Sequence, residues 1–131
     1  MGRTDVYKVR IPLPDGDQPI VLGAVLEGMN PSDAPAAGKP NDPMMPVAWT
    51  RTYSGTQRKP ARIFTTTMGS GQDLLNESFR RLLVNACFWA IGVESRITER
   101  SSVEVVAAYE PLPFKFGGAA HDVKPSDLQL R

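Results

Sequence analysis

The sequence predicts a small mixed α/β domain, and two observations support this prediction. Two β-prone stretches, 47–53 and 61–68, are joined by a polar connection that contains glycine, which favours an antiparallel hairpin. The segment that follows carries apolar residues at helical spacing from Leu75 to Ala90. A chain of 131 residues has room for one ordinary domain built from such elements.

Two further strand-like stretches precede the hairpin. Residues 5–11 alternate imperfectly between polar and apolar side chains, and residues 19–29 are apolar and β-branched at the start, which indicates a buried strand. Gly23 within it is expected to mark a bulge or a site of close packing. Five prolines between residues 30 and 46 predict a long loop without regular structure, because each proline removes a donor and restricts its predecessor. Such a loop is either functional or a plain surface excursion.

The helix is the clearest element of the sequence. Ser70 or Asp73 can cap its N-terminus, and Gly92 suits the position just past its end. Its polar side is expected to comprise Glu77, Arg80, Arg81 and Asn85, whereas one apolar stripe comprises Leu75, Phe79, Leu82, Leu83, Ala86 and Ala90. Val84, Phe88 and Ile91 form a second apolar patch, so the helix is expected to be packed on more than one side.

The chain changes character after Arg96. Residues 103–106 are predicted to form a short strand, and the prolines and glycines that follow predict extended chain with a polar tail. The sequence is therefore divided into a domain portion, 1–96, and a C-terminal extension, 97–131.

Composition excludes several classes of function. The formal net charge of +1 is not that of a nucleic-acid-binding domain. One cysteine and one histidine cannot form a zinc site, so no metal and no cofactor are expected. Cys87 lies among apolar residues and is predicted to be buried, and His121 is predicted to be solvated in the tail. No apolar run reaches the ~20 residues of a membrane span. No signal peptide is visible, so the compartment stays open: cytoplasmic, or exported from a longer precursor.

The connection between the second hairpin strand and the helix is the first candidate site. A helix N-terminus offers free N–H groups, and small residues let a ligand approach the backbone there. Binding crevices of open α/β sheets also lie beyond the carboxyl ends of strands. The candidate ligand-binding residues for a polar or anionic molecule are Thr67, Gly69, Ser70, Gly71 and Asp73. An ordinary strand-to-helix turn is the alternative, and the phosphate-binding P-loop pattern is absent.

Trp49 and Arg51 form a second, more distant candidate. They share one face of a strand and are able to stack on a sugar or a base. The alternative is a core tryptophan beside an arginine whose aliphatic stem is buried and whose charge reaches water.

Three segments, taken in order, carry a family resemblance. Residues 46–53 form a Pro-x-x-Trp strand, residues 61–69 a strand ending in Met-Gly, and residues 79–92 a helix of the Phe-Arg-Arg-Leu-Leu type followed by Asn-Ala and Trp-Ala. Together they resemble the closing third of the ThuA-like (trehalose-utilisation) family, and the core of the resemblance covers residues 43–94. It is the combined order of the segments that makes the resemblance specific.

The resemblance implies a flavodoxin-like, three-layer α/β fold similar to that of class I glutamine amidotransferases. It also implies that this chain is the C-terminal portion of such a domain, because family members are longer and their N-terminal half supplies the first parallel strands. The implied function is the binding or processing of a carbohydrate-derived small molecule, with the reaction undefined. A homo-oligomer would be a second way to complete the fold.

The sequence departs from the family at one chemically important position. Relatives often keep a histidine where this chain has Ser70, and a hydroxyl is not a general base. The Cys-His-Glu chemistry of amidotransferases needs a nucleophile and a histidine, and this sequence has neither at a suitable position. Triad catalysis is therefore not expected. Whether the protein is an enzyme stays open. The alternative is a non-catalytic interaction or structural domain of a larger protein or oligomer.

Overall fold

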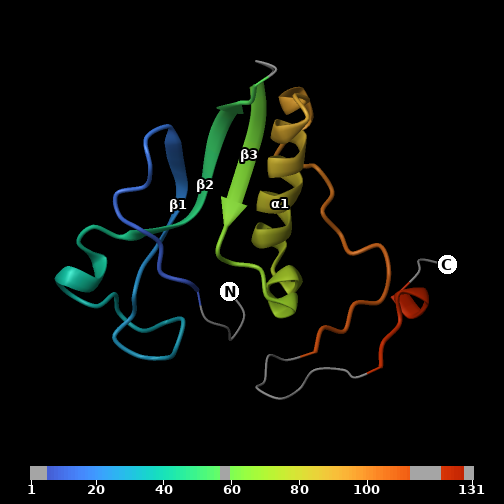
Figure 1. The fold of residues 1–131 in the computed structure, drawn as a ribbon. Coiled ribbons are helices and arrows are strands. Elements are labelled where there is room, and N and C mark those ends of the chain that lie inside the picture. Colours follow the sequence, from blue (N-terminus) through green and yellow to red (C-terminus); the bar gives the residue numbers. More distant parts are fainter. Residues whose placement is uncertain (1–5, 57–59, 113–121, 129–131) are drawn as a thin grey trace.

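A computed structural model describes residues 6–56, 60–112 and 122–128 (Figure 1). These residues form a mixed α/β structure, which confirms the predicted class at this level. Three antiparallel strands lie in the order β1-β2-β3, with the single α-helix α1 packed beside β3. The strands are β1 (Asp17–Gly23), β2 (Met45–Ser54) and β3 (Pro60–Thr66), and α1 is Glu77–Ala90. Short 3₁₀ helices are η1 (Lys39–Asn41), η2 (Gly71–Leu75), η3 (Glu94–Arg96) and η4 (Pro125–Leu128).

The predicted hairpin is confirmed as the pair β2–β3. Its register runs without interruption from Ala48 opposite Thr66 to Ser54 opposite Pro60. β2 begins at Met45, inside the stretch expected to be a proline-rich loop. Pro46 is tolerated there because β3 does not extend alongside it, so the strand has an open side at that residue.

The first strand is shorter than predicted. β1 ends at Gly23 rather than continuing to residue 29, and its pairing with β2 is irregular between Pro19 and Leu22. The close packing expected at Gly23 is confirmed, since a Cβ there would lie 2.7 Å from Val47 Cγ1. The strand expected over 5–11 does not form within residues 6–11, where the backbone has no sheet partner.

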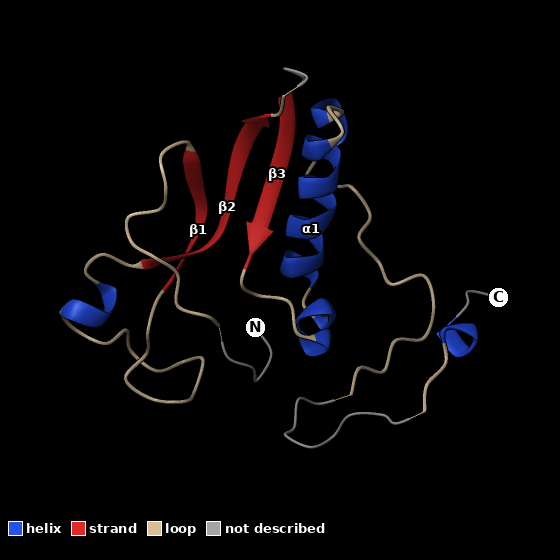
Figure 2. Cartoon of the chain, viewed as in Figure 1, coloured by secondary structure: helices blue, strands red, loops and turns tan. Residues whose placement is uncertain are grey.

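Residues 24–44, called the arm below, are more ordered than their proline content predicted. The Asn41 side chain accepts from Val25 N at 2.7 Å and donates to Val25 O at 2.8 Å and Ala36 O at 2.7 Å. Leu26 and Pro35 form an isolated bridge, and η1 lies farther along the arm (Figure 2). A side-chain amide thus replaces some of the backbone pairing that prolines prevent.

The helix is confirmed, but its start is not where the caps predicted. Asn76 is the N-cap of α1, with Oδ1 accepting from Phe79 N at 3.1 Å, whereas Ser70 and Asp73 cap the separate η2. Leu75 belongs to η2 and is 55% exposed, so it does not contribute to the helix stripe as expected. The extended backbone of Asn76 separates the two helices. Gly92 follows the helix with φ of 79°, as its position suggested.

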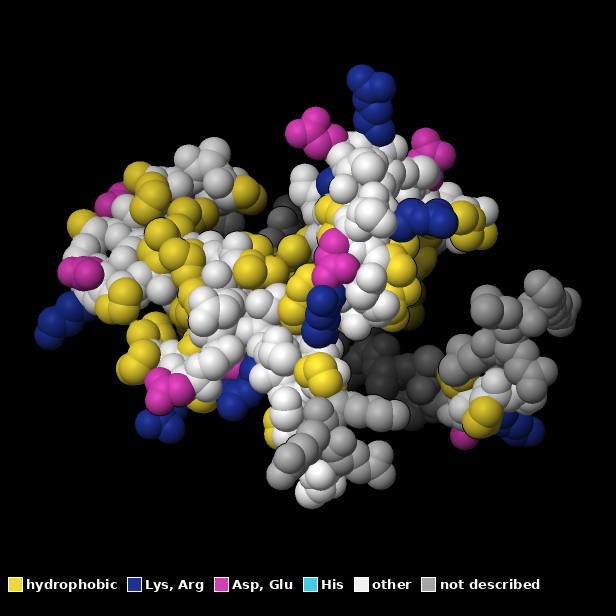
Figure 3. All heavy atoms as spheres, turned by 90° about the horizontal axis from the view of Figure 1, so that it is seen from above, with side chains coloured by type: hydrophobic (Ala, Val, Ile, Leu, Met, Phe, Trp, Pro, Cys, Tyr) yellow, Lys and Arg dark blue, Asp and Glu magenta, His cyan; other side chains and the backbone are white. Residues whose placement is uncertain are grey.

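The hydrophobic core of the described residues is small. Its buried apolar members are Pro46, Val47, Ala48, Phe79 and Val103. Ile20 and Leu22 of β1 are both 49% exposed, and Ile63 of β3 is 40% exposed. Apolar side chains are therefore visible at the surface between charged ones (Figure 3). Cys87, predicted to be buried, is exposed, because it lies on a side of α1 that the sheet does not cover.

Residues 97–112, called the strap below, run back along α1 toward η2. Arg80 Nε donates to Val103 O at 2.6 Å, and Arg81 Nη1 donates to Ser101 O at 2.8 Å. Val103 is buried, but the strand expected over 103–106 does not form. Arginine side chains, rather than a neighbouring strand, bond the strap carbonyls. The division of the chain after residue 96 stays a prediction.

A charged cluster closes the C-terminal end of α1. Arg62 of β3 forms an ion pair with Glu94 of η3 and donates to Trp89 O at 2.6 Å. Its guanidinium lies 5.4 Å from the centroid of the Trp89 ring, which is within the range of a cation–π contact. This cluster links β3, α1 and η3 at the surface.

The Glu94 carboxyl makes this cluster sensitive to acid. Bonding to the backbone N–H of Glu94 and then to Arg62 holds the pKa of Glu94 below its ordinary value of 4.5. Glu94 therefore contributes stability above pH 4.5, and this contribution is lost as the pH falls through the lower folded pKa. We expect Glu94→Gln to lower the melting temperature at pH 7 and to have progressively less effect below pH 4.5. Calorimetry across this range, with Glu99→Gln as the control for net charge, would contradict the expectation if the effect did not change with pH.

Candidate functional site

The connection from β3 to α1 is built around one buried carboxylate. Asp73 is 2% exposed, and its Oδ2 accepts from Gly69 N at 3.1 Å and from Ser70 N at 3.0 Å. The Ser70 hydroxyl in turn accepts from Asp73 N at 3.3 Å. This reciprocal pair is a capping box, which fixes the turn at the start of η2. Gly69 adopts φ of 135°, a conformation that favours glycine.

The capping box changes what the turn can bind. The N–H groups of Gly69 and Ser70, expected to face a ligand, are bonded to Asp73 instead. The Asp73 carboxylate stands where an anion would sit, and a second negative group beside it would be repelled. Ser70 Oγ still has a proton to donate. The geometry therefore favours a neutral polar ligand over the anionic one at this turn.

The strap covers one side of the same turn. Tyr109 donates its hydroxyl proton to Gly71 O at 2.9 Å. A Cβ at Gly71 would lie only 3.2 Å from Pro111 Cβ, so the strap lies directly against this glycine. The role of Gly71 in the folded chain is thus close packing with the strap.

Thr67 lies at the end of β3 with a hydroxyl that has no partner in the described residues. Its backbone N–H donates to Val47 O at 3.0 Å, but its Oγ1 is buried and makes no hydrogen bond there. The neighbouring Thr66 hydroxyl is used internally, since it donates to Val47 O at 3.0 Å and accepts from Met68 N at 3.1 Å. Thr67 Oγ1 therefore has no hydrogen-bond partner among the described residues, but it is buried and does not face a ligand from the surface.

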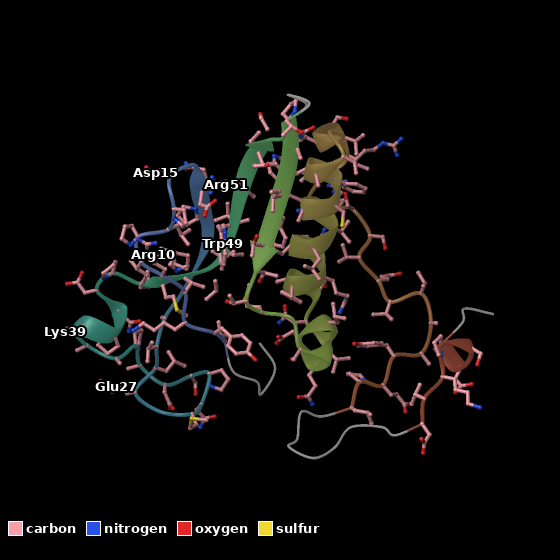
Figure 4. All side chains as sticks on the ribbon, in the orientation of Figure 1. Arg10, Asp15, Glu27, Lys39, Trp49 and Arg51 are labelled. Carbon is pink, nitrogen blue, oxygen red and sulfur yellow. The ribbon has the colours of Figure 1, made fainter. Side chains whose placement is uncertain are left out.

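Trp49 and Arg51 belong to a different part of the molecule. Side chains alternate along β2, and Thr50 lies on the face toward α1, so Trp49 and Arg51 lie on the opposite face (Figure 4). Arg51 Nη1 is 3.2 Å from Asp17 Oδ1 of β1 in an ion pair. Trp49 is half-buried beside it. The structure thus separates this pair from the turn at residues 67–73.

A cavity of about 280 Å³ lies between the sheet and α1, and the sequence did not predict it. Ile20, Phe64, Leu82, Ala86 and Trp89 make it largely apolar. Asn85, expected on the wet side of the helix, also lines it. Its Oδ1 is buried and has no hydrogen-bond partner in the described part of the chain.

The spacing of Asn85 is a signal that sequence reasoning passed over. It lies three residues after Leu82 and four before Trp89, so all three share one side of α1. That side faces the sheet, where both apolar residues line the cavity. A residue spaced in this way from two buried apolar residues is expected on the buried side of the helix, even when its own side chain is polar.

A second cavity of about 280 Å³ lies at the seam between α1 and the strap. Arg80, Arg81 and Arg100 line it together with Glu77 and Glu104. Arg81 pairs with Glu77 at 2.9 Å, and Arg80 also donates to Leu74 O at 2.8 Å. Arg80 and Arg81 thus hold the strap and the start of the helix.

No group of three or more His, Cys, Asp and Glu side chains within residues 6–56, 60–112 and 122–128 is arranged to hold a metal ion. His121 lies outside the described residues. In the same ranges no helix has the length and apolar character needed to cross a bilayer. Comparison with known proteins finds no matching family model, no matching curated protein and no matching solved structure.

Proposed function

We propose that this chain is the C-terminal portion of a ThuA-like, flavodoxin-like domain that binds a neutral, carbohydrate-derived small molecule. The observation that carries the proposal is the turn at residues 67–73, where β3 leads through a capped Gly-Ser-Gly segment into η2 and α1. Ligands of open, mostly parallel α/β sheets bind beyond the carboxyl ends of strands. The three described strands are antiparallel, and the turn follows the carboxyl end of β3. The proposal assigns the turn that binding position in a larger sheet.

The chemistry of the turn favours a polyol. Ser70 Oγ can donate while it accepts from Asp73 N, whereas Thr67 Oγ1 is buried and would become available only if the turn opened. Sugar hydroxyls both donate and accept, so they match a group such as the Ser70 hydroxyl. The buried Asp73 carboxylate opposes phosphorylated or acidic sugars at the same place. Binding without triad chemistry is proposed, since Ser70 stands where relatives often have histidine.

The three-layer part of the proposal is supported by the incomplete burial of the sheet. Ile20 and Leu22 are exposed on β1, and Ile63 is exposed on β3. A three-layer fold covers both faces of its sheet, so additional polypeptide or a second copy would bury these side chains.

A second candidate function is a non-catalytic interaction domain, and the arm favours it. Met29 is fully exposed in the arm, which Asn41 holds in place. Val25 and Met44 of the arm are also exposed, and several exposed apolar side chains on one ordered projection are suited to contact another protein. In this alternative the arm and the extension, rather than the turn, carry the function.

The binding proposal is tested with the variant Ser70→Trp and the matched control Ser70→Thr. The tryptophan would fill the turn, while threonine preserves the hydroxyl cap. Titration calorimetry with glucose, trehalose and gluconate is the measurement. We expect the wild-type chain and Ser70→Thr to bind a neutral sugar more tightly than gluconate, and Ser70→Trp to lose binding. Unchanged affinity in Ser70→Trp, or no sugar binding by the wild-type chain, would refute the proposal.

A further inference from the structure

The cavity between the sheet and α1 has the features of a binding site for a small apolar molecule. Its volume is about 280 Å³, whereas voids in a well-packed protein interior rarely exceed the size of a water molecule. Residues from all three strands, from α1 and from the strap line it: Ile20, Thr50, Phe64, Leu82, Asn85, Ala86, Trp89 and Ile97. None of them belongs to the turn at residues 67–73, so this cavity is separate from the proposed sugar site.

The lining disfavours both charged molecules and polyols. None of the lining residues is charged, so an ionic group would lose its hydration there without gaining a counter-ion. Thr50 and Asn85 are the polar side chains, one on the sheet and one on α1. A sugar carries more hydroxyl groups than these two side chains can satisfy. The lining therefore fits a neutral, mainly apolar molecule with a single polar group.

The same shortage of polar groups opposes a peptide segment as the occupant. Each residue of a buried chain brings a backbone N–H and a C=O that need partners. Thr50 and Phe64 lie opposite each other in the β2–β3 ladder, so the sheet beside the cavity is already paired. A small molecule with one polar group brings no such row of backbone groups.

Asn85 is positioned to recognise that polar group. Its Oδ1 is buried and makes no hydrogen bond in the described residues. The amide plane of an asparagine turns readily about the Cβ–Cγ bond, and rotation here breaks no hydrogen bond at Oδ1. Either end of the amide can thus be presented to the cavity, and a hydroxyl group matches both ends because it donates and accepts.

The cavity is accessible and has room for a molecule of modest size. Ile20 is 49% exposed and Ile97 is 36% exposed, whereas the other lining residues are half-buried. A ligand is therefore able to enter beside these two side chains while the sheet stays paired. An apolar cavity of about 150 Å³ accepts benzene, so the present volume has room for about ten non-hydrogen atoms.

We propose that this cavity binds a neutral aromatic alcohol of about ten non-hydrogen atoms. Its ring packs against Phe64 and Trp89, and its hydroxyl group bonds to the Asn85 amide. The Arg62 guanidinium, 5.4 Å from the centroid of the Trp89 ring, holds that wall of the cavity in place.

A titration of the full, nitrogen-15-labelled chain followed by NMR tests the proposal. The probes are 2-phenylethanol, ethylbenzene and phenylacetate, which share a ring and differ in the polar group. We expect 2-phenylethanol to bind at least tenfold more tightly than phenylacetate and more tightly than ethylbenzene. The amide signals of the lining residues should shift, and those of residues 69–71 should not. No binding of 2-phenylethanol, or tighter binding of phenylacetate, would overturn the assignment.

Ala86→Leu and Ala90→Leu form a matched pair of variants on α1. Ala86 lines the cavity, whereas Ala90 is exposed. Leucine at position 86 would fill the cavity, so we expect it to weaken 2-phenylethanol binding at least tenfold without lowering the melting temperature. Ala90→Leu is expected to bind like wild type. Asn85→Leu keeps an apolar lining and is expected to reduce the affinity for 2-phenylethanol to that for ethylbenzene.

Three outcomes with these variants would overturn the assignment. Wild-type affinity in Ala86→Leu would place the ligand elsewhere on the chain. A preference for 2-phenylethanol that persists in Asn85→Leu would remove the role given to the amide. A wild-type dimer in sedimentation that dissociates in Ala86→Leu would identify a second copy of the chain as the occupant of the cavity.

Discussion

Phe79→Ala is expected to lower the free energy of unfolding by about 3–5 kcal/mol, which is the usual range for removing a core aromatic side chain. Phe79 is 8% exposed and is one of five buried apolar residues in the described part of the chain. Its ring also lies under the turn, because a Cβ at Gly69 would be 3.8 Å from Phe79 Cζ. Loss of the ring would therefore loosen both the packing of α1 and the candidate site.

Urea denaturation followed by circular dichroism measures this effect. Ile91→Ala is a suitable control, since Ile91 directly follows α1 but is 72% exposed. We expect its effect to be a small fraction of that of Phe79→Ala. Equal effects of the two substitutions would show that Phe79 does not anchor the helix.

Asp73→Ala is expected to lower the free energy of unfolding by about 2–3 kcal/mol, because it leaves two backbone donors without an acceptor and removes half of a capping box. The two donors are the N–H groups of Gly69 and Ser70. Asp73→Asn retains one oxygen that can accept both bonds, so its effect should be smaller. The turn would also lose its shape, and hydrogen exchange at Gly69 and Ser70 should accelerate.

The same denaturation experiment, with Asp127→Ala as a control for removing a carboxylate, checks the prediction. Asp127 lies in the exposed η4 and bonds mainly to neighbouring residues. A loss for Asp73→Ala no larger than that for Asp127→Ala would contradict the proposed role of the buried carboxylate.

The elements best predicted from sequence are those defined by local pattern. β2, β3 and α1 follow from alternation, from β-branched and aromatic content and from helical spacing, and each forms close to the predicted residues. The antiparallel pairing of β2 with β3 follows from the short polar connection between them. These signals are local, so no knowledge of the rest of the fold is needed to interpret them.

Features that depend on tertiary partners were not predictable in the same way. Residues 103–106 have the composition of a strand, but Arg80 bonds the carbonyl of Val103, and none of the strands in the described residues lies beside it. Cys87 lies among apolar residues in the sequence, yet the sheet covers another side of the helix. In both cases the local pattern is compatible with two environments, and the packing of distant segments decides between them.

The candidate site was predicted in part. The turn at residues 67–73 exists where the Gly-Ser-Gly segment indicated, but its donors face an internal carboxylate. Both Ser70 and Asp73 were recognised as capping residues, although for the wrong helix. A capping box satisfies the same N–H groups that an anion would bind, so the sequence pattern alone is unable to distinguish the two uses.

The local hydrogen bonds that hold the arm, those of the Asn41 amide and the backbone bonds from Glu27 N to Ala34 O and from Ala36 N to Val25 O, have a consequence for the dynamics of the molecule. Asn41 makes three hydrogen bonds that join Val25 and Ala36, whereas the sheet beyond Gly23 and Met45 does not depend on them. The arm is therefore expected to open at a lower free energy than global unfolding requires, while β1, β2 and β3 stay paired. Proteolysis within residues 24–44 would accordingly report this local opening and not the global stability of the chain.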